Sequence, residues 1–383
     1  MKKIALVLPG AGSRGPFQVG YIKAISDICK SFKITENPFK IYCGISAGSI
    51  TSTMLASYSD DFFKAVEILD INTRLLDYDW VFKINRKKVI NSVLPTVSNR
   101  FSPLHPDQNS FLDSSPQRDN IFSLIPFDKI EKNIKAGFID AASVTTTHVK
   151  SGLSTTFFQA DNKFENWQRH QRVGIRASIN ADHLQASCAI PGLFPAISID
   201  GKYFFDGGVR NIAPLSPALH LGAEKIMLIH INQDNRTHHL PLEKEAQAPS
   251  LGELGFFILE GLMSDGVHMD LDRIRSINEK IKLSKEKSIQ GQFYNFRPID
   301  VMDIRPELDF NAVALKYRKS LPLSLKLITG MGSKADSSLM SYLMFHPQYL
   351  SDLIDLGYKQ GMENKDQIAG FLELDKMTDK KVA

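Results

Sequence analysis

The sequence Phe39-Lys40-Ile41-Tyr42-Cys43-Gly44-Ile45-Ser46-Ala47-Gly48 decides the fold of this chain. Its apolar run ends at a Gly-x-Ser-x-Gly turn, and apolar residues at helical spacing continue from Ile50 to Tyr58. This order predicts a strand, a tight turn and a helix. A serine in such a turn is held clear of the backbone at the end of a sheet, as in a nucleophile elbow. Ser46 also fits the simpler role of an N-cap for the following helix.

The composition is that of a globular protein with a large core. The chain has 383 residues, of which 43% are hydrophobic and 23% charged, which allows one large α/β domain with additions or two domains. The formal net charge of +4 is small, and the sequence lacks the pattern of several basic clusters interleaved with aromatic residues. Nucleic acid is therefore not expected as a partner.

Cysteine usage and hydropathy indicate the compartment. Cys29, Cys43 and Cys188 have a spacing that fits neither a disulfide framework nor a zinc site. No apolar stretch approaches the roughly 20 residues of a membrane-spanning helix, and the apolar run Ile4 to Leu8 is shorter than a signal-peptide core. We expect a cytoplasmic or peripheral membrane protein, and export without a cleavable signal stays open.

The N-terminal elements predict an α/β fold. Ile4 to Leu8 is a continuous apolar run of strand length, and residues Phe17 to Cys29 have helical spacing. With the strand and helix around Ser46, this start predicts a parallel sheet with helices on both faces. Further strands are expected at Ala141 to Thr147, Thr155 to Gln159, Tyr203 to Phe205, Lys225 to Ile231 and Ile299 to Ile304.

A glycine-rich loop separates the first strand from the first helix. It consists of Gly10, Ala11, Gly12, Ser13, Arg14 and Gly15. Successive backbone N–H groups that open onto a helix N-terminus form an anion-binding concavity, which is what an oxyanion hole requires. The spacing also matches a dinucleotide loop, but that motif expects an acidic residue at the end of the next strand. Ser46 occupies that region instead, which disfavours nucleotide binding.

The candidate base is Asp206, in Asp206-Gly207-Gly208 at the end of an expected strand. An Asp-Gly turn is common and has no chemical role by itself. The role as base is favoured here because the sequence already offers a serine nucleophile and an anion-binding loop, and a base is what such a site still needs. Histidine is the usual general base. Of the ten histidines, His183 near the start of a short expected helix is the one to test in a Ser-His-Asp alternative.

Five segments in order resemble the patatin-like phospholipases. They are the loop Gly10–Gly15, the turn Gly44–Gly48, the stretch Ser187–Ala196, the turn Asp206–Gly208 and the stretch Asn211–Ala223. The resemblance covers about residues 1–235. It implies a three-layer α/β/α fold with a central, mostly parallel sheet, and a lipid acyl hydrolase that uses neither a metal nor another cofactor.

The resemblance also implies roles for the site residues. Ser46 would attack an ester carbonyl, Asp206 would accept its proton, and the amides of residues 10–15 would hold the oxyanion. An aspartate of ordinary pKa, roughly 3.9, is a weak base at neutral pH. The family often has glycine where this chain has Ala11, so a positive φ there would strain the loop. Arg14 would brace the loop or favour an anionic head group, unless it is a surface arginine.

The implied substrate is a phospholipid or lysophospholipid, which requires contact with a membrane surface. Trp80, Phe82, Lys83, Arg86, Lys87 and Lys88 combine aromatic and basic residues suited to an anionic lipid surface, although a solvated helix face explains them slightly better. Phe256–Met263 is expected to be a core helix or a lid. Activation by a protein partner stays open.

The chain is expected to divide near residue 235. Residues 1–235 would form the catalytic domain, and residues 236–383 a mainly helical extension packed on it. Two other functions remain: an esterase or thioesterase that acts on soluble acyl substrates, and a non-catalytic nucleotide-binding or interaction module.

Overall fold

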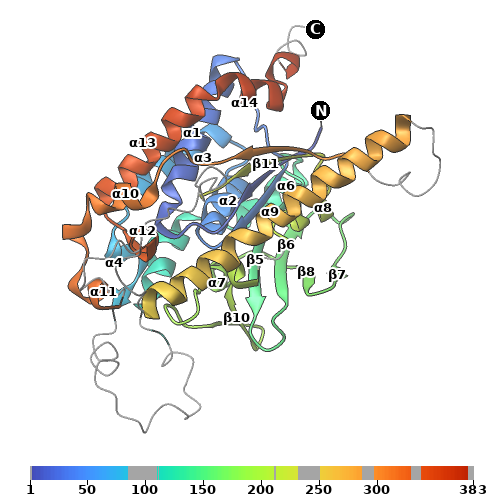
Figure 1. Cartoon of the computed structure of the whole chain (residues 1–383). Helices are drawn as coiled ribbons and strands as arrows, with labels where there is room; N and C mark the ends of the chain where they lie inside the picture. The colour runs from blue at the N-terminus through green and yellow to red at the C-terminus, as the bar shows by residue number, and fades with distance from the viewer. Residues whose placement is uncertain are drawn as a thin grey trace, which may run out of the picture.

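Buried apolar strands form the centre of the fold (Figure 1). The computed structural model describes residues 2–84, 110, 112–210, 213–231, 251–286, 297–328 and 338–377. Five strands pair in parallel, in the order β12-β11-β1-β2-β5. Their bounds are β1 (Ile4–Leu8), β2 (Ile41–Ile45), β5 (Ala141–His148), β11 (Lys225–Ile229) and β12 (Asp300–Ile304). The expected sheet of mostly parallel strands is thereby confirmed.

The other half of the sheet is mixed. The strand β6 (Ser154–Ala160) runs antiparallel to β5, because the connection between them is a tight turn rather than a crossover. Then follow β8 (Arg172–Arg176) and β7 (Trp167–Arg169). The strand β10 (Lys202–Asp206) pairs with β5 and with β9 (Ile197–Ile199). A separate ribbon joins β3 (Lys83–Ile84) and β4 (Leu112–Asp113). The sequence did not predict β7, β8 or β9.

Helices cover both faces of the sheet, as the α/β prediction requires. Side chains alternate along β1: Ile4, Leu6 and Leu8 enter one core, whereas Ala5 and Val7 enter the other. The first core lies under α1 (Pro16–Ser31), α2 (Ala47–Ser57), α3 (Phe62–Leu75) and α13 (Pro347–Glu363), and the second under α8 (Ser216–His220) and α9 (Leu251–Glu286). Shorter helices are α4 (Tyr78–Val81), α6 (Asp128–Lys135), α7 (Ala181–Ser187), α10 (Phe310–Leu315), α11 (Leu323–Ile328), α12 (Ser338–Leu343) and α14 (Lys365–Leu372).

The C-terminal helices pack directly on the N-terminal helix. A Cβ atom on Gly20 of α1 would lie 2.0 Å from the carbonyl oxygen of Ile354, and one on Gly357 of α13 would lie 2.2 Å from that of Phe17. The two backbones therefore approach as closely as glycine permits. The strand β12 also lies beyond residue 235 and pairs with β11. The proposed boundary at residue 235 thus crosses one continuous sheet, and its status as a domain boundary stays a prediction.

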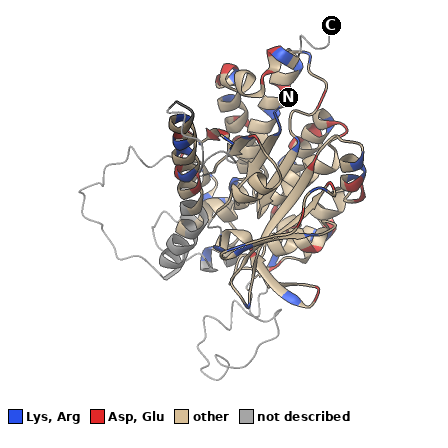
Figure 2. Cartoon of the chain, turned by 90° about the vertical axis from the view of Figure 1, so that its right-hand side faces the viewer, with Lys and Arg blue, Asp and Glu red and all other residues tan. Residues whose placement is uncertain are grey.

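Charges are mixed along the helices instead of gathered by sign (Figure 2). On α9, Arg273 pairs with Asp270 and Arg275 with Asp272, each one helical turn apart. Among the helices of the described ranges, none combines the length and the apolar character needed to cross a bilayer.

Candidate active site

The sheet brings Ser46 and Asp206 together through one strand, β5. Residues Ile41–Ile45 of β2 pair in parallel with Ala141–Thr145, and Asp206 of β10 pairs with the next residue, Thr146. The strand β6 covers the opposite edge of β5, so β2 and β10 share one edge and meet end to end. Ser46 follows the last residue of β2, and Asp206 is the last residue of β10. The pairing on β5 therefore makes neighbours of Ser46 and Asp206, which are 160 positions apart in the sequence.

Ser46 lies in a strained turn between β2 and α2. Its backbone has φ 54° and ψ −130°, a conformation that costs a non-glycine residue about 1–3 kcal/mol. Its N–H donates to the Ser187 hydroxyl at 2.8 Å, and that hydroxyl donates to the Thr145 carbonyl at 2.7 Å. A Cβ on Gly48 would lie 2.2 Å from the carbonyl oxygen of Leu8, so the turn fits only because glycine flanks the serine.

Asp206 is a buried carboxylate with an unusual pKa. It is 1% exposed, and Oδ1 accepts a hydrogen bond from the Gly208 N–H at 2.8 Å. Oδ2 has no hydrogen-bond partner of standard geometry within the described residues. Burial raises the pKa of Asp206 to about 7, and the nearby Ser46 hydroxyl and Gly208 N–H only partly oppose the rise. The ordinary acidity assumed from the sequence does not hold here, and Asp206 is suited to exchange a proton near neutral pH.

The glycine loop forms a short turn in front of α1. Gly12–Arg14 is a single 3₁₀ turn, in which the Arg14 N–H donates to the Ala11 carbonyl and the Gly15 N–H to the Gly12 carbonyl. Ala11 has φ −136°, so alanine causes no strain there. The positive φ falls on Gly12, at 51°.

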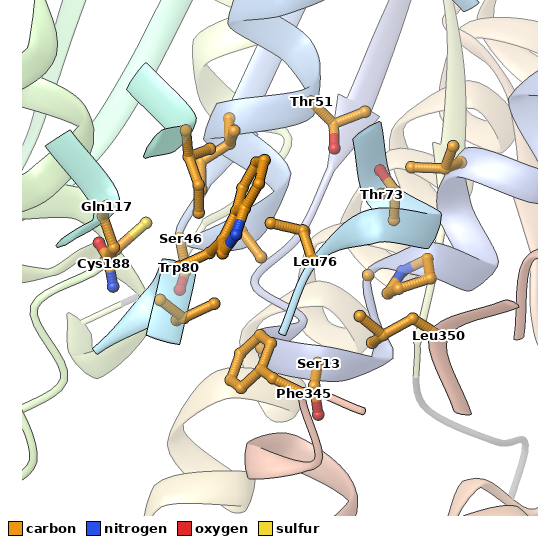
Figure 3. Close-up of a pocket in the computed structure, with 18 of the residues that line it drawn as sticks. Ser13, Ser46, Thr51, Thr73, Leu76, Trp80, Gln117, Cys188, Phe345 and Leu350 are labelled. Carbon is orange, nitrogen blue, oxygen red and sulfur yellow. The ribbon is translucent and has the colours of Figure 1, made fainter. Parts of the chain in front are cut away.

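An apolar cavity of about 140 Å³ opens beside Ser46. Of the six loop residues, Gly12, Ser13 and Gly15 line it, whereas Gly10, Ala11 and Arg14 do not. Figure 3 shows Ser46 at one side of this cavity and Leu350 at the other, with Trp80 between them. Most of the wall is aliphatic or aromatic and comes from both halves of the chain: Ile50, Met54, Leu69, Leu76, Val81, Phe194, Leu343 and Phe345 contribute.

His183 has a structural role in the described contacts. Its Nδ1 lies 2.8 Å from Asn180 Oδ1 in a capping box at the start of α7, and its ring packs against Phe157 at 4.5 Å between centroids. Burial lowers the pKa of His183. None of its contacts in the described part of the chain is with Ser46 or Asp206.

The structure corrects the sequence interpretation for one member of the aromatic and basic cluster, Phe82. Phe82 is 2% exposed and packs against Phe194 and Phe345, so it belongs neither to a lipid-contacting surface nor to a solvated helix face. Trp80 lines the cavity, and Lys83 is exposed. The remaining members, Arg86, Lys87 and Lys88, lie outside the described residues, and so do the side chains of the run Phe256–Met263 on α9.

Two neighbours of Ser46 were not singled out from the sequence. Ser187 fixes the Ser46 backbone, and Cys188 lines the cavity. Burial, reinforced by the Asp206 charge, raises the pKa of the Cys188 thiol well above its usual range, so it stays protonated. The stretch Ser187–Ala196, which resembles the patatin-like phospholipases, could have pointed to both residues. Within the described residues, no group of His, Cys, Asp or Glu side chains is arranged to hold a metal ion.

The strain at Ser46 predicts that glycine at this position is more stabilising than alanine, which is the reverse of its effect at a position with negative φ. Ser46→Gly should have a free energy of unfolding roughly 1 kcal/mol higher than that of Ser46→Ala, because glycine adopts φ 54° without penalty. Calorimetry of both variants measures the difference. Ala136→Gly, at an exposed position with φ −77°, is the matched control and should lower stability. If Ser46→Ala proves at least as stable as Ser46→Gly, the turn is unstrained.

Comparison with known proteins places the chain in a family. The family model described as patatin-like phospholipase matches residues 6–219. The structure of VipD from Legionella pneumophila aligns over 96% of this chain and 67% of its own length, with 15% sequence identity and a TM-score of 0.34. The family match includes the glycine loop, Ser46 and Asp206. The chain therefore belongs to the patatin-like phospholipase family, a family of lipid acyl hydrolases.

Proposed function

We propose that this protein hydrolyses the acyl ester bonds of phospholipids or lysophospholipids, with Ser46 as nucleophile and Asp206 as base. The observation that carries the proposal is the end-to-end meeting of β2 and β10 on β5, which puts the Asp206 carboxylate beside the Ser46 hydroxyl at the wall of an apolar cavity. An apolar cavity suits a fatty acyl chain, whose transfer from water is favourable at about 0.8 kcal/mol for each buried CH₂ group.

The proposed reaction proceeds in two half-reactions. Ser46 Oγ attacks the ester carbonyl while its proton moves to the Asp206 carboxylate. The alcohol product, which is a lysophospholipid or, from a lysophospholipid, a glycerophosphodiester, leaves with that proton, and an acyl group remains on Ser46. Asp206 then takes a proton from water, whose oxygen attacks the acyl carbon. The bond from that carbon to Ser46 Oγ breaks, Asp206 returns the proton to Ser46 Oγ, and the fatty acid is released. Because Asp206 is buried, its charge acts in a dry setting where electrostatic effects are strong.

The glycine loop supplies the oxyanion site in this proposal. The Ser46 N–H is already bound to Ser187, and the Arg14 and Gly15 N–H groups are bound within the 3₁₀ turn. The N–H groups of Gly12 and Ser13 make no hydrogen bond with any described residue, and both residues line the cavity. We therefore assign the oxyanion to these two amides in particular.

The dyad is tested by fatty-acid release from mixed vesicles of diacyl- and lysophosphatidylcholine in EDTA. Wild type should release fatty acid, and Ser46→Ala and Asp206→Asn should each lose about a thousandfold or more, because each removes a group that the reaction needs. Ser57→Ala, which removes a buried hydroxyl bonded to the Met54 carbonyl, is the matched control and should keep its activity.

The other outcomes of this assay separate the alternatives. Near-full activity of Asp206→Asn would contradict the dyad and make His183 the next base to test. A wild type that cleaves short-chain esters but no lipid would identify a soluble acyl substrate. Saturable nucleotide binding that ignores Ser46→Ala would identify a non-catalytic module.

The raised pKa of Asp206 predicts the pH profile. Asp206 can accept a proton only as the carboxylate, so kcat/KM should fall about tenfold per pH unit below about pH 7 and level off above it. A neutral short-chain ester is the substrate, since it does not itself titrate. An inflection near about pH 4 would indicate an aspartate of ordinary pKa and would contradict the buried base.

A further inference from the structure

The C-terminal region lies directly against the glycine loop. A Cβ on Gly12 would lie 2.7 Å from the carbonyl oxygen of Tyr342 in α12, so the two backbones are in contact. The Ser13 hydroxyl donates to the Ser341 carbonyl at 2.8 Å. Ser13 and Ser341 are both fully buried. The 3₁₀ turn is therefore held from outside by a segment more than 300 residues later, as the numbering shows.

Arg14 is the centre of this contact. Its Nε and Nη2 donate to the Ser341 hydroxyl oxygen at 3.0 Å and 2.7 Å. Its guanidinium lies 3.9 Å above the centre of the Tyr342 ring and 5.1 Å from that of Phe310. The Ser341 hydroxyl in turn donates to Asn311 Oδ1 at 2.8 Å. A buried charge is costly unless polar and aromatic partners surround it, so these contacts fix the side chain and the loop that carries it.

The orientation of Arg14 decides between its expected roles. The residue is 4% exposed and does not line the cavity. Its described contacts include α10 and α12, and the Tyr342 ring over which its guanidinium lies separates it from the cavity that Tyr342 lines. This burial and these contacts exclude the interpretation of Arg14 as a surface arginine. They favour the role of holding the loop in place over that of binding a lipid head group.

We infer that Ser341 and Tyr342 are positioning residues for the oxyanion site: they clamp Arg14 and Ser13 and so aim the Gly12 and Ser13 N–H groups at the carbonyl oxygen of the bound ester. This inference rests on the proposed function. The Gly12–Arg14 turn has two internal backbone hydrogen bonds, which alone hold so short a loop weakly. A shift of about 1 Å in such a group can cost about a hundredfold in rate.

Hydrogen–deuterium exchange tests the clamp without relying on activity. In Ser341→Ala, amides in peptides covering residues 10–17 should exchange about tenfold faster than in wild type, because Arg14 loses both hydrogen bonds to the Ser341 hydroxyl and keeps the longer one to Asn311 Oδ1 at 3.4 Å. The strands β5 and β6 should be unaffected. Ser57→Ala, another fully buried serine, should leave residues 10–17 unchanged. Unchanged exchange in Ser341→Ala, or an equal increase throughout the chain, would overturn the inference.

Kinetics on a neutral short-chain ester test the catalytic consequence. Ser341→Ala should lower kcat about tenfold or more while KM changes by less than about twofold, because the loop acts on the transition state. Ser341→Thr, which keeps the hydroxyl, should recover most of the rate. An unchanged kcat in Ser341→Ala, or the same loss in Ser57→Ala, would contradict a positioning role.

The two measurements separate the inference from the proposed function. Faster exchange at residues 10–17 in Ser341→Ala, together with a wild type that cleaves no ester, would refute the hydrolase and leave the clamp in place. An active wild type with unchanged exchange in Ser341→Ala would refute the clamp alone. If Ser341→Ala does not fold, Asn311→Ala removes the next partner of the Ser341 hydroxyl, and the same predicted changes decide the question.

Discussion

The candidate active site depends on one edge of one strand. β5 pairs with β2 along residues 141–145 and with β10 from residue 146 onward, so a parallel and an antiparallel neighbour share the edge in succession. The junction has no room for a side chain at position 207, because a Cβ on Gly207 would lie 2.3 Å from the carbonyl oxygen of Thr145. Because the backbone pairing sets the positions of Ser46 and Asp206, their proximity does not require either side chain to attract the other.

The same junction collects features that oppose stability. Ser46 has a strained backbone, and the Asp206 carboxylate is buried with one oxygen lacking a standard hydrogen-bond partner within the described residues. Since its folded pKa is raised to about 7, Asp206 favours the folded state less as the pH rises from its unfolded pKa through about 7. Strain and a perturbed pKa at one place are typical of a catalytic site. The surrounding parallel strands and glycine contacts hold the arrangement.

Residue patterns revealed the parts of the fold that are local. The apolar run Ile4–Leu8 and the turn around Ser46 predicted β1, β2 and their helices, because buried parallel strands have continuous apolar sequences. β7 is short and mostly polar, and β8 is a short strand with arginine at both ends and glycine in its middle, so neither has the apolar run that predicts a strand. The burial of Phe82 and the raised pKa of Asp206 depend on residues distant in sequence. So does the contact of Tyr342 with Gly12, and no local pattern encodes it.

Reaction of the protein with an alkyl fluorophosphonate tests the central claim most directly, because the reagent reports both the nucleophile and its activation. The account predicts one adduct, located at Ser46 by mass spectrometry, that forms faster as the pH rises through about 7 and far more slowly in Asp206→Asn. An adduct at another residue, or equal labelling of Ser46 in Asp206→Asn, would contradict it.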